Sequence, residues 1–172
     1  TVHHGFITSA LVLTLTLGAG WGAWLLWQIG TRGRFSGASD AQIIAHGEAQ
    51  LWGFVALLVI GISLRTALQG ALRQPLGIWI CRGLLALGLV GVGGSVLWSL
   101  FPARLASLGI LSAAALGLMS LGLFGMQIVL LRPKWRATWA RAILASGLWL
   151  SVWAAATALF RWNAGVAGPG AY

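Results

Sequence analysis

The chain has 172 residues, of which 59% are hydrophobic and only 8% charged, and its formal net charge is +9. Soluble proteins carry about 25% charged residues, so the composition excludes a soluble protein and predicts one integral membrane domain over residues 1–172. The basic residues fall almost wholly between apolar segments. This position predicts that the basic residues orient the chain in the membrane and contact lipid headgroups, and we expect no nucleic acid as a partner.

Five apolar segments are long enough to cross a bilayer as helices, which takes about 20 residues each. The predicted fold class is all-α, a polytopic membrane helical bundle. Its spans are expected at residues 6–29, 43–64, 83–101, 105–131 and 142–160. In the first span Gly18 and Gly22 form a GxxxG pair, which predicts close packing against another helix.

The second span contains the only histidine and the only glutamate found in any long apolar segment, His46 and Glu48. His46 and Gln50 are four residues apart and share a helix face, whereas Glu48 points elsewhere and is expected to face outward, near headgroup water. Gly47 and Gly53 remove side chains beside the histidine, which favours the approach of a flat ring or a helix. These four positions, His46, Gln50, Gly47 and Gly53, are the candidate cofactor site, with His46 as the metal ligand. The alternative is a histidine hydrogen-bonded across helices.

The third and fourth spans are rich in small residues. Gly88, Gly91, Gly93 and Gly94 lie in the third span, and Gly109, Ala113 and Gly117 are spaced by four in the fourth. Such residues are frequent where membrane helices touch. The segment Pro102 to Arg104 is short, so these two spans are predicted to be antiparallel neighbours joined by the tightest turn of the chain.

The strongest basic run lies between the fourth and fifth spans. Arg132, Lys134 and Arg136 are interleaved with tryptophans there, a pattern typical of anchors to anionic lipid headgroups. Five spans place this run on the same side as the N-terminus. That side carries seven basic residues against four on the other: Arg65, Arg73, Arg82, Arg132, Lys134, Arg136 and Arg141 against Arg32, Arg34, Arg104 and Arg161. The positive-inside rule then predicts a bacterial inner (cytoplasmic) membrane protein with a cytoplasmic N-terminus and a periplasmic C-terminus.

The string AHGEAQLWGFVALLVIGISLRT, residues 45–66, resembles the second transmembrane helix of the haem–copper oxidase subunit I superfamily, and more closely that of NnrS-like membrane proteins. In the oxidases the corresponding histidine is an axial ligand of the low-spin haem, so the resemblance implies that His46 ligates haem b. The family's other ligating histidines lie on later helices, and this chain has no histidine after His46. The resemblance therefore implies no complete catalytic site, and we expect no enzyme.

Three functions are compatible with these patterns. The first is a non-catalytic integral membrane subunit that packs against and stabilises a larger respiratory or photosynthetic electron-transfer complex, with other membrane subunits as partners and a cofactor at His46. The second is an NnrS-like haem-binding membrane protein. The third is a protein in which His46 holds a chlorophyll-type pigment. The sequence also leaves open that no cofactor is bound.

Overall fold

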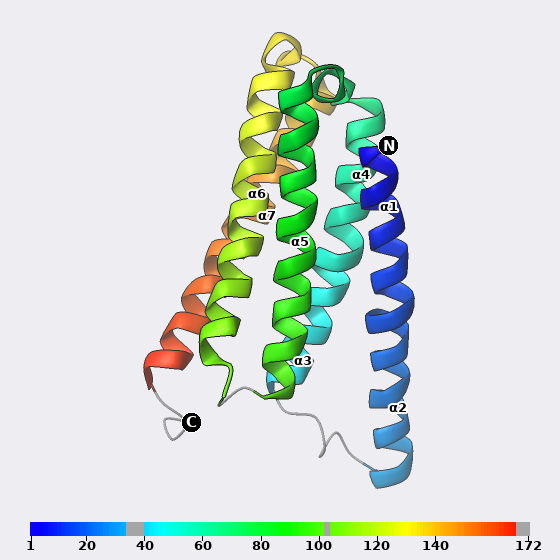
Figure 1. Ribbon diagram of the computed structural model, residues 1–172, viewed down its shortest axis with the longest axis vertical. Coiled ribbons are helices and arrows are strands. Elements are labelled where there is room, and N and C mark those ends of the chain that lie inside the picture. The colour runs from blue at the N-terminus through cyan, green and yellow to red at the C-terminus, as the bar shows by residue number, and fades with distance from the viewer. Residues whose placement is uncertain (34–39, 102–103, 168–172) are drawn as a thin grey trace.

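The computed structural model describes residues 1–33, 40–101 and 104–167, and nearly all of them are helical (Figure 1). In this part of the chain five helical segments are long and apolar enough to cross a membrane, which confirms the predicted all-α membrane bundle. The segments are Val2–Thr31, Ala41–Thr66, Pro75–Leu100, Ala106–Lys134 and Thr138–Leu159.

Each of the first two spans has a stretch of π-helix in its middle. The first span comprises α1 (Val2–Leu13), η1 (Thr14–Ala19) and α2 (Gly20–Arg32). The second comprises α3 (Asp40–Glu48), η2 (Ala49–Ala56) and α4 (Leu57–Thr66). The two π-helical segments, η1 and η2, lie against each other. Because π-helical turns occur often at functional sites, this region of the bundle is a place to look for one.

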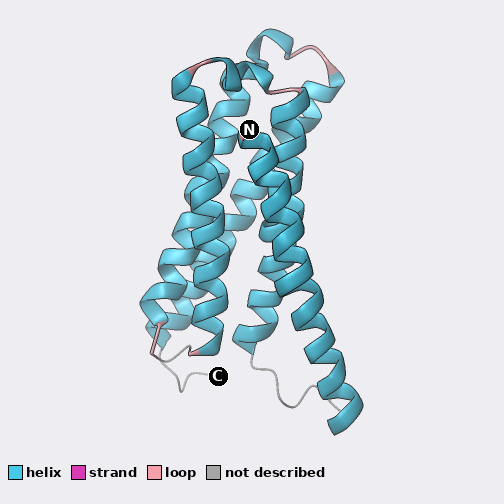
Figure 2. Cartoon of the chain, turned by 45° about the vertical axis from the view of Figure 1, so that its right-hand side comes forward, coloured by secondary structure: helices cyan, strands magenta, loops and turns pink. Residues whose placement is uncertain are grey.

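Glycines allow these two spans to approach closely. A side chain at Gly61 of α4 would collide with Ile7 of α1, and one at Gly18 of η1 would collide with the Gln50 amide. At Gly22 a Cβ atom would lie 3.7 Å from the His46 ring. The predicted GxxxG contact face is thereby confirmed, and its partner is the second span. Toward its C-terminal end α2 diverges from the rest of the bundle (Figure 2).

The next two long helices, α5 (Pro75–Leu100) and α6 (Ala106–Leu131), pack against each other as predicted. At the contact, a Cβ atom on Gly91 would lie 2.6 Å from Leu116 Cγ, and one on Gly94 would lie 3.0 Å from Ser112 Cβ. Backbones this close require glycine. Within the predicted turn, Pro102 and Ala103 lie outside the described residues.

Two of the predicted small-residue positions are not in contact. A Cβ atom on Gly93 or on Gly117 would meet no atom within 4 Å, whereas Gly109 packs on the Trp98 ring and Ala113 is buried. The expectation that Gly117 continues the α6 packing face is wrong, because the α6 residues that lie against the α5 glycines are Ser112, Leu116 and Met119.

The third span begins at Pro75 and not at residue 83 as predicted. Proline is favoured in the first turn of a helix, where its missing N–H is not needed. Arg82, expected at the span's edge, lies within α5, where its side chain is exposed and its guanidinium carbon is 5.4 Å from the centre of the Trp79 ring. A long arginine side chain can extend toward headgroups from such a position, so the charge does not end the helix.

The last helix, α7 (Thr138–Ala167), is the least enclosed of the five spans. It packs along α6, where Gly147 adjoins the Phe124 ring. Two short 3₁₀ helices, η3 (Gln69–Arg73) and η4 (Arg132–Lys134), connect spans at the end of the bundle that holds the N-terminus, and α7 runs from this end to the other (Figure 1). The core between the spans includes Trp52, Leu57 and Met119.

Candidate functional site

His46 and Gln50 face the first span. The His46 ring packs edge-on against Trp21, with ring centroids 6.4 Å apart, and lies beside Gly22. One turn further on, the Gln50 amide fills the space that Gly18 leaves. The structure therefore brings these two predicted site residues together on one face, but it fills that face with the first span.

Gly47 and Gly53 lie elsewhere. A Cβ atom on Gly53 would be 3.2 Å from Leu13 Cδ1 and 3.5 Å from Val92 Cγ1, so this glycine is packed between α1 and α5. Gly47 is exposed, has no atom within 4 Å of its Cβ position, and lines a cavity on another side of the helix. Neither glycine provides space beside the His46 ring.

Glu48 is buried, with only 5% of its surface exposed. The sequence-based prediction that this carboxylate faces outward is wrong. The reason is that α3 packs against α5, where the Ser95 hydroxyl, itself fully buried, donates a hydrogen bond to Glu48 Oε2. An ionised carboxylate removed from water costs several kcal/mol unless a proton, a cation or hydrogen-bond donors compensate it. Glu48 is thus the chemically distinctive group of the second span.

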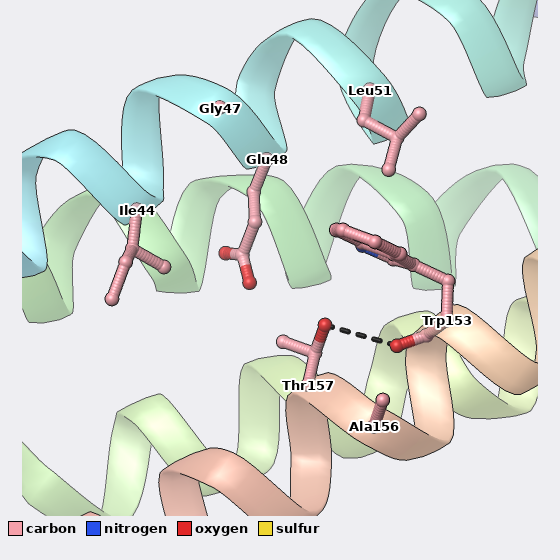
Figure 3. A pocket seen from close by; sticks show the side chains of 7 residues that line it. All are labelled: Ile44, Gly47, Glu48, Leu51, Trp153, Ala156 and Thr157. Atoms are coloured by element: carbon pink, nitrogen blue, oxygen red, sulfur yellow. Dashed lines mark hydrogen bonds between the residues drawn. The ribbon is translucent and has the colours of Figure 1, made fainter.

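The Glu48 side chain points into a cavity of about 500 Å³ between the second span and α7 (Figure 3). Opposite it, Thr157 of α7 points back toward the carboxylate, and its hydroxyl donates a hydrogen bond of 3.0 Å to the Trp153 carbonyl oxygen. The remaining surface is apolar. The lining residues are Ile44, Gly47, Glu48 and Leu51 from the second span, and Trp153, Ala156 and Thr157 from α7. We call this the Glu48 cavity.

Sequence reasoning missed Ser95, Thr157 and Trp153 as members of a site. Ser95 and Thr157 are polar residues inside apolar spans, which is a signal, although such hydroxyls often bond to their own helix and carry no other role. Whether Ser95 or Thr157 lies next to Glu48 depends on how α3, α5 and α7 are rotated about their axes. This rotation is visible only in the folded chain.

The fit of a haem or chlorophyll-type ring to His46 can be judged from the atoms around it. His46 Nδ1 is buried and has no hydrogen-bond partner. Trp21 and Gly22 occupy the space beside the ring, and His46 is not among the residues lining the Glu48 cavity. A macrocycle enclosed within this chain therefore does not fit at His46 as the helices stand. Among the described residues, no group of three or more His, Cys, Asp or Glu side chains is placed to hold a metal ion.

The basic run lies on the surface at the N-terminal end of the bundle. Arg132, Lys134 and Arg136 are exposed around one hollow of about 500 Å³, and the Lys134 ammonium is 5.5 Å from the centre of the Trp139 ring. Cations and indoles side by side are the groups that anchor a helix end at a membrane interface.

Comparison of the chain with protein-family models, with curated proteins and with solved structures finds no match.

Proposed function

We propose that the chain is a non-catalytic subunit of a larger energy-transducing membrane complex, and that it contacts its partner through the outer face of α7. This face consists of Leu148, Trp149, Val152 and Leu159, all of them more than half exposed. The observation that supports the proposal is the position of Trp149. Its side chain is 68% exposed and stands in the middle of a span.

Trp149 lies eleven positions after Thr138, where the fifth span begins. At a rise of about 1.5 Å per residue this is about 16 Å, half of a hydrocarbon core of about 30 Å. Tryptophan is enriched at membrane interfaces because its N–H needs a polar neighbour. An indole exposed at mid-membrane depth is better accommodated by another protein surface than by lipid chains.

Trp79 provides the contrast. It is 67% exposed, almost the same fraction as Trp149, but it lies in the second turn of α5 with the Arg82 guanidinium over its ring. This is an interfacial location, and lipid headgroups account for it. Exposure alone therefore does not distinguish the two tryptophans, whereas depth does.

The resemblance of residues 45–66 to the second helix of haem–copper oxidase subunit I and NnrS-like proteins supports a complex of the respiratory or photosynthetic electron-transfer kind. In this proposal the chain lies in a bacterial cytoplasmic membrane with its N-terminus inside. Arg132, Lys134 and Arg136 bind anionic lipid headgroups there, because their exposed charges and neighbouring tryptophans suit that surface.

A second candidate, ligation of a haem or chlorophyll-type ring by His46, is favoured by the buried Nδ1 atom that has no hydrogen-bond partner. Since the space inside the chain is filled, such a ring would bind where α2 diverges from α3, between this chain and a partner. The chromophore would then depend on the complex, and the isolated chain would be colourless.

Site-specific photocrosslinking tests the proposal. A benzophenone amino acid is placed at position 149, or at position 79 as the matched control, and the full chain is irradiated in its native membrane. We expect position 149 to form one discrete adduct with an electron-transfer subunit, identified by mass spectrometry, and position 79 to form lipid adducts only. Lipid adducts alone at both positions would refute the partner surface.

A further inference from the structure

A second cavity, of about 640 Å³, lies between α1 and α5 at the end of the bundle that holds the N-terminus. It shares no residue with the Glu48 cavity. A Cβ atom on Gly5 would lie 3.1 Å from Leu85 Cδ2, so the two helices touch about one turn deeper than Arg82. We call this space the Arg82 cavity. Its lining residues are Thr1, Val2, His3 and Gly5 from the start of the chain, Leu72 from η3, and Ile78, Arg82 and Leu85 from α5.

The charges around the Arg82 cavity favour an anionic ligand. Arg82 and His3 are the basic side chains of the lining, and no described lining residue is acidic. Arg65 of α4 is close enough to His3 for their charges to interact. The chain has only two acidic residues, Asp40 and Glu48, and both belong to α3, toward the other end of the bundle (Figure 1). No acidic side chain of the protein therefore compensates the arginines at this cavity.

The Arg82 side chain is suited to a phosphate group. Its guanidinium carbon is 5.4 Å from the centre of the Trp79 ring, a contact that uses one face of the planar group. The five N–H donors lie in the plane of the guanidinium, and their geometry matches the oxygens of a phosphate. The first turn of α5 has no side-chain cap and no acidic residue, so the partial positive charge of this helix end adds to the attraction.

The depth and the remaining walls define the rest of the ligand. Arg82 lies seven residues after Pro75, about 10 Å along α5. The exposed Trp79 beside it has an interfacial location, and a long arginine side chain reaches from there to the level of lipid phosphates. Apolar walls suit the body of a lipid better than a free phosphate ion. These walls are formed by Val2, Leu72, Ile78 and Leu85.

We propose that the Arg82 cavity binds one phospholipid whose headgroup has a net negative charge. The Arg82 guanidinium donates hydrogen bonds to the phosphate oxygens, His3 and Arg65 add positive charge beside them, and the apolar part of the lipid packs on Ile78 and Leu85. This site is distinct from the exposed hollow around Arg132, Lys134 and Arg136, with which it shares no lining residue. It needs no partner subunit, so it does not depend on the function proposed above.

Native mass spectrometry of the full chain in dodecyl maltoside provides the test, because it resolves the protein with and without a bound lipid. Every protein compared carries glutamine in place of Arg132, Lys134 and Arg136, which removes the cations of the exposed hollow, and this protein is called the parent. Arg82→Gln then removes the arginine of the cavity. Arg73→Gln is the matched control, because Arg73 is exposed at the same end of the bundle and does not line the cavity. The probes are dioleoylphosphatidylglycerol, dioleoylphosphatidylcholine and inorganic phosphate.

We expect the parent and Arg73→Gln to bind phosphatidylglycerol with the same dissociation constant. Arg82→Gln should bind it about tenfold more weakly, since hydrogen bonds between charged groups are the strong ones. Phosphatidylcholine, whose headgroup is neutral overall, should bind the parent about tenfold more weakly than phosphatidylglycerol, and inorganic phosphate should not displace the lipid.

Three results would overturn the proposal. Equal affinity of Arg82→Gln and Arg73→Gln for phosphatidylglycerol would show that the lipid is not held by Arg82. Equal affinity of the parent for phosphatidylcholine would exclude recognition of the net charge. Displacement by inorganic phosphate would show that the cavity takes the phosphate group alone and does not select a lipid.

Two variants of the parent locate the binding site without changing its charge. Ile78→Trp places a larger side chain in the cavity and should weaken the binding of phosphatidylglycerol. Ile80→Trp makes the same change at an exposed position of α5 that does not line the cavity, and should bind like the parent. If both variants bind like the parent, the lipid does not occupy the Arg82 cavity.

Discussion

Replacing Gly91 by alanine tests how tightly α5 and α6 pack, and Gly93 is the internal control. Both glycines lie in the middle of α5. A methyl group on Gly91 would lie 2.6 Å from Leu116 Cγ and 3.2 Å from the Ser112 carbonyl oxygen, whereas one on Gly93 would meet no atom within 4 Å. The Ser112 oxygen belongs to the backbone, so the clash can be relieved only if the helices separate.

The expected magnitudes follow from two effects. Overpacking a close contact costs about 1–3 kcal/mol. Exchange of glycine for alanine inside a helix gains up to about 1 kcal/mol, and this gain is common to both variants. The difference in the free energy of unfolding between Gly91→Ala and Gly93→Ala therefore isolates the packing effect, and we expect about 1–3 kcal/mol, with Gly91→Ala the less stable variant.

The assay is equilibrium unfolding in mixed micelles, in which the fraction of a denaturing detergent is raised and helix content is followed by circular dichroism. The Gly93→Ala protein should unfold at the same or a higher detergent fraction than the wild type, and the Gly91→Ala protein at a lower one. If the two variants unfold together, or in the reverse order, the α5–α6 contact is not the one described.

Three further predictions concern orientation, lipids and His46. A cysteine at position 104 should react with an impermeant thiol reagent added from the periplasmic side and one at position 134 should not; the reverse pattern would overturn the topology. Changing Arg132, Lys134 and Arg136 together to glutamine should reduce co-purifying anionic lipid, as measured by lipid mass spectrometry, and unchanged lipid would exclude a headgroup site. In the complex extracted from its native membrane, His46→Ala should remove any chromophore held at that residue while the bundle survives, because a hydrogen bond in a membrane contributes only about 0.6–2 kcal/mol; an unchanged absorption spectrum of that complex would make His46 structural.

The number of spans and the pairing of α5 with α6 could be predicted from the sequence. Apolar length determines which segments cross a membrane, and the predicted contact glycines Gly18, Gly91 and Gly94 do lie where helices meet. The sequence could not show which glycines in one helix face a neighbour. Gly91 touches α6 and Gly93 does not, although both are flanked by apolar residues. In a membrane helix the lipid-facing and protein-facing sides are equally apolar, so no polar face marks the orientation.

The candidate site was predicted only in part for the same reason. The shared face of His46 and Gln50 was expected from their spacing, but its partner is the first span and not a free slot. A carboxylate at a helix start can reach water, which predicts an outward-facing Glu48. Its burial depends on Ser95, a residue of another span, and on the packing of α3 against α5. Such a contact across the chain leaves no local pattern in the sequence.

The mass of the particle that contains this chain in mild detergent tests the proposed function most directly. A tagged full chain is extracted from its native membrane, and native mass spectrometry determines what remains bound to it. We expect a particle that contains electron-transfer subunits together with the 18.1 kDa chain, and loss of those subunits in Trp149→Ala but not in Trp79→Ala. A stable, monodisperse particle that holds the 18.1 kDa chain alone would contradict it.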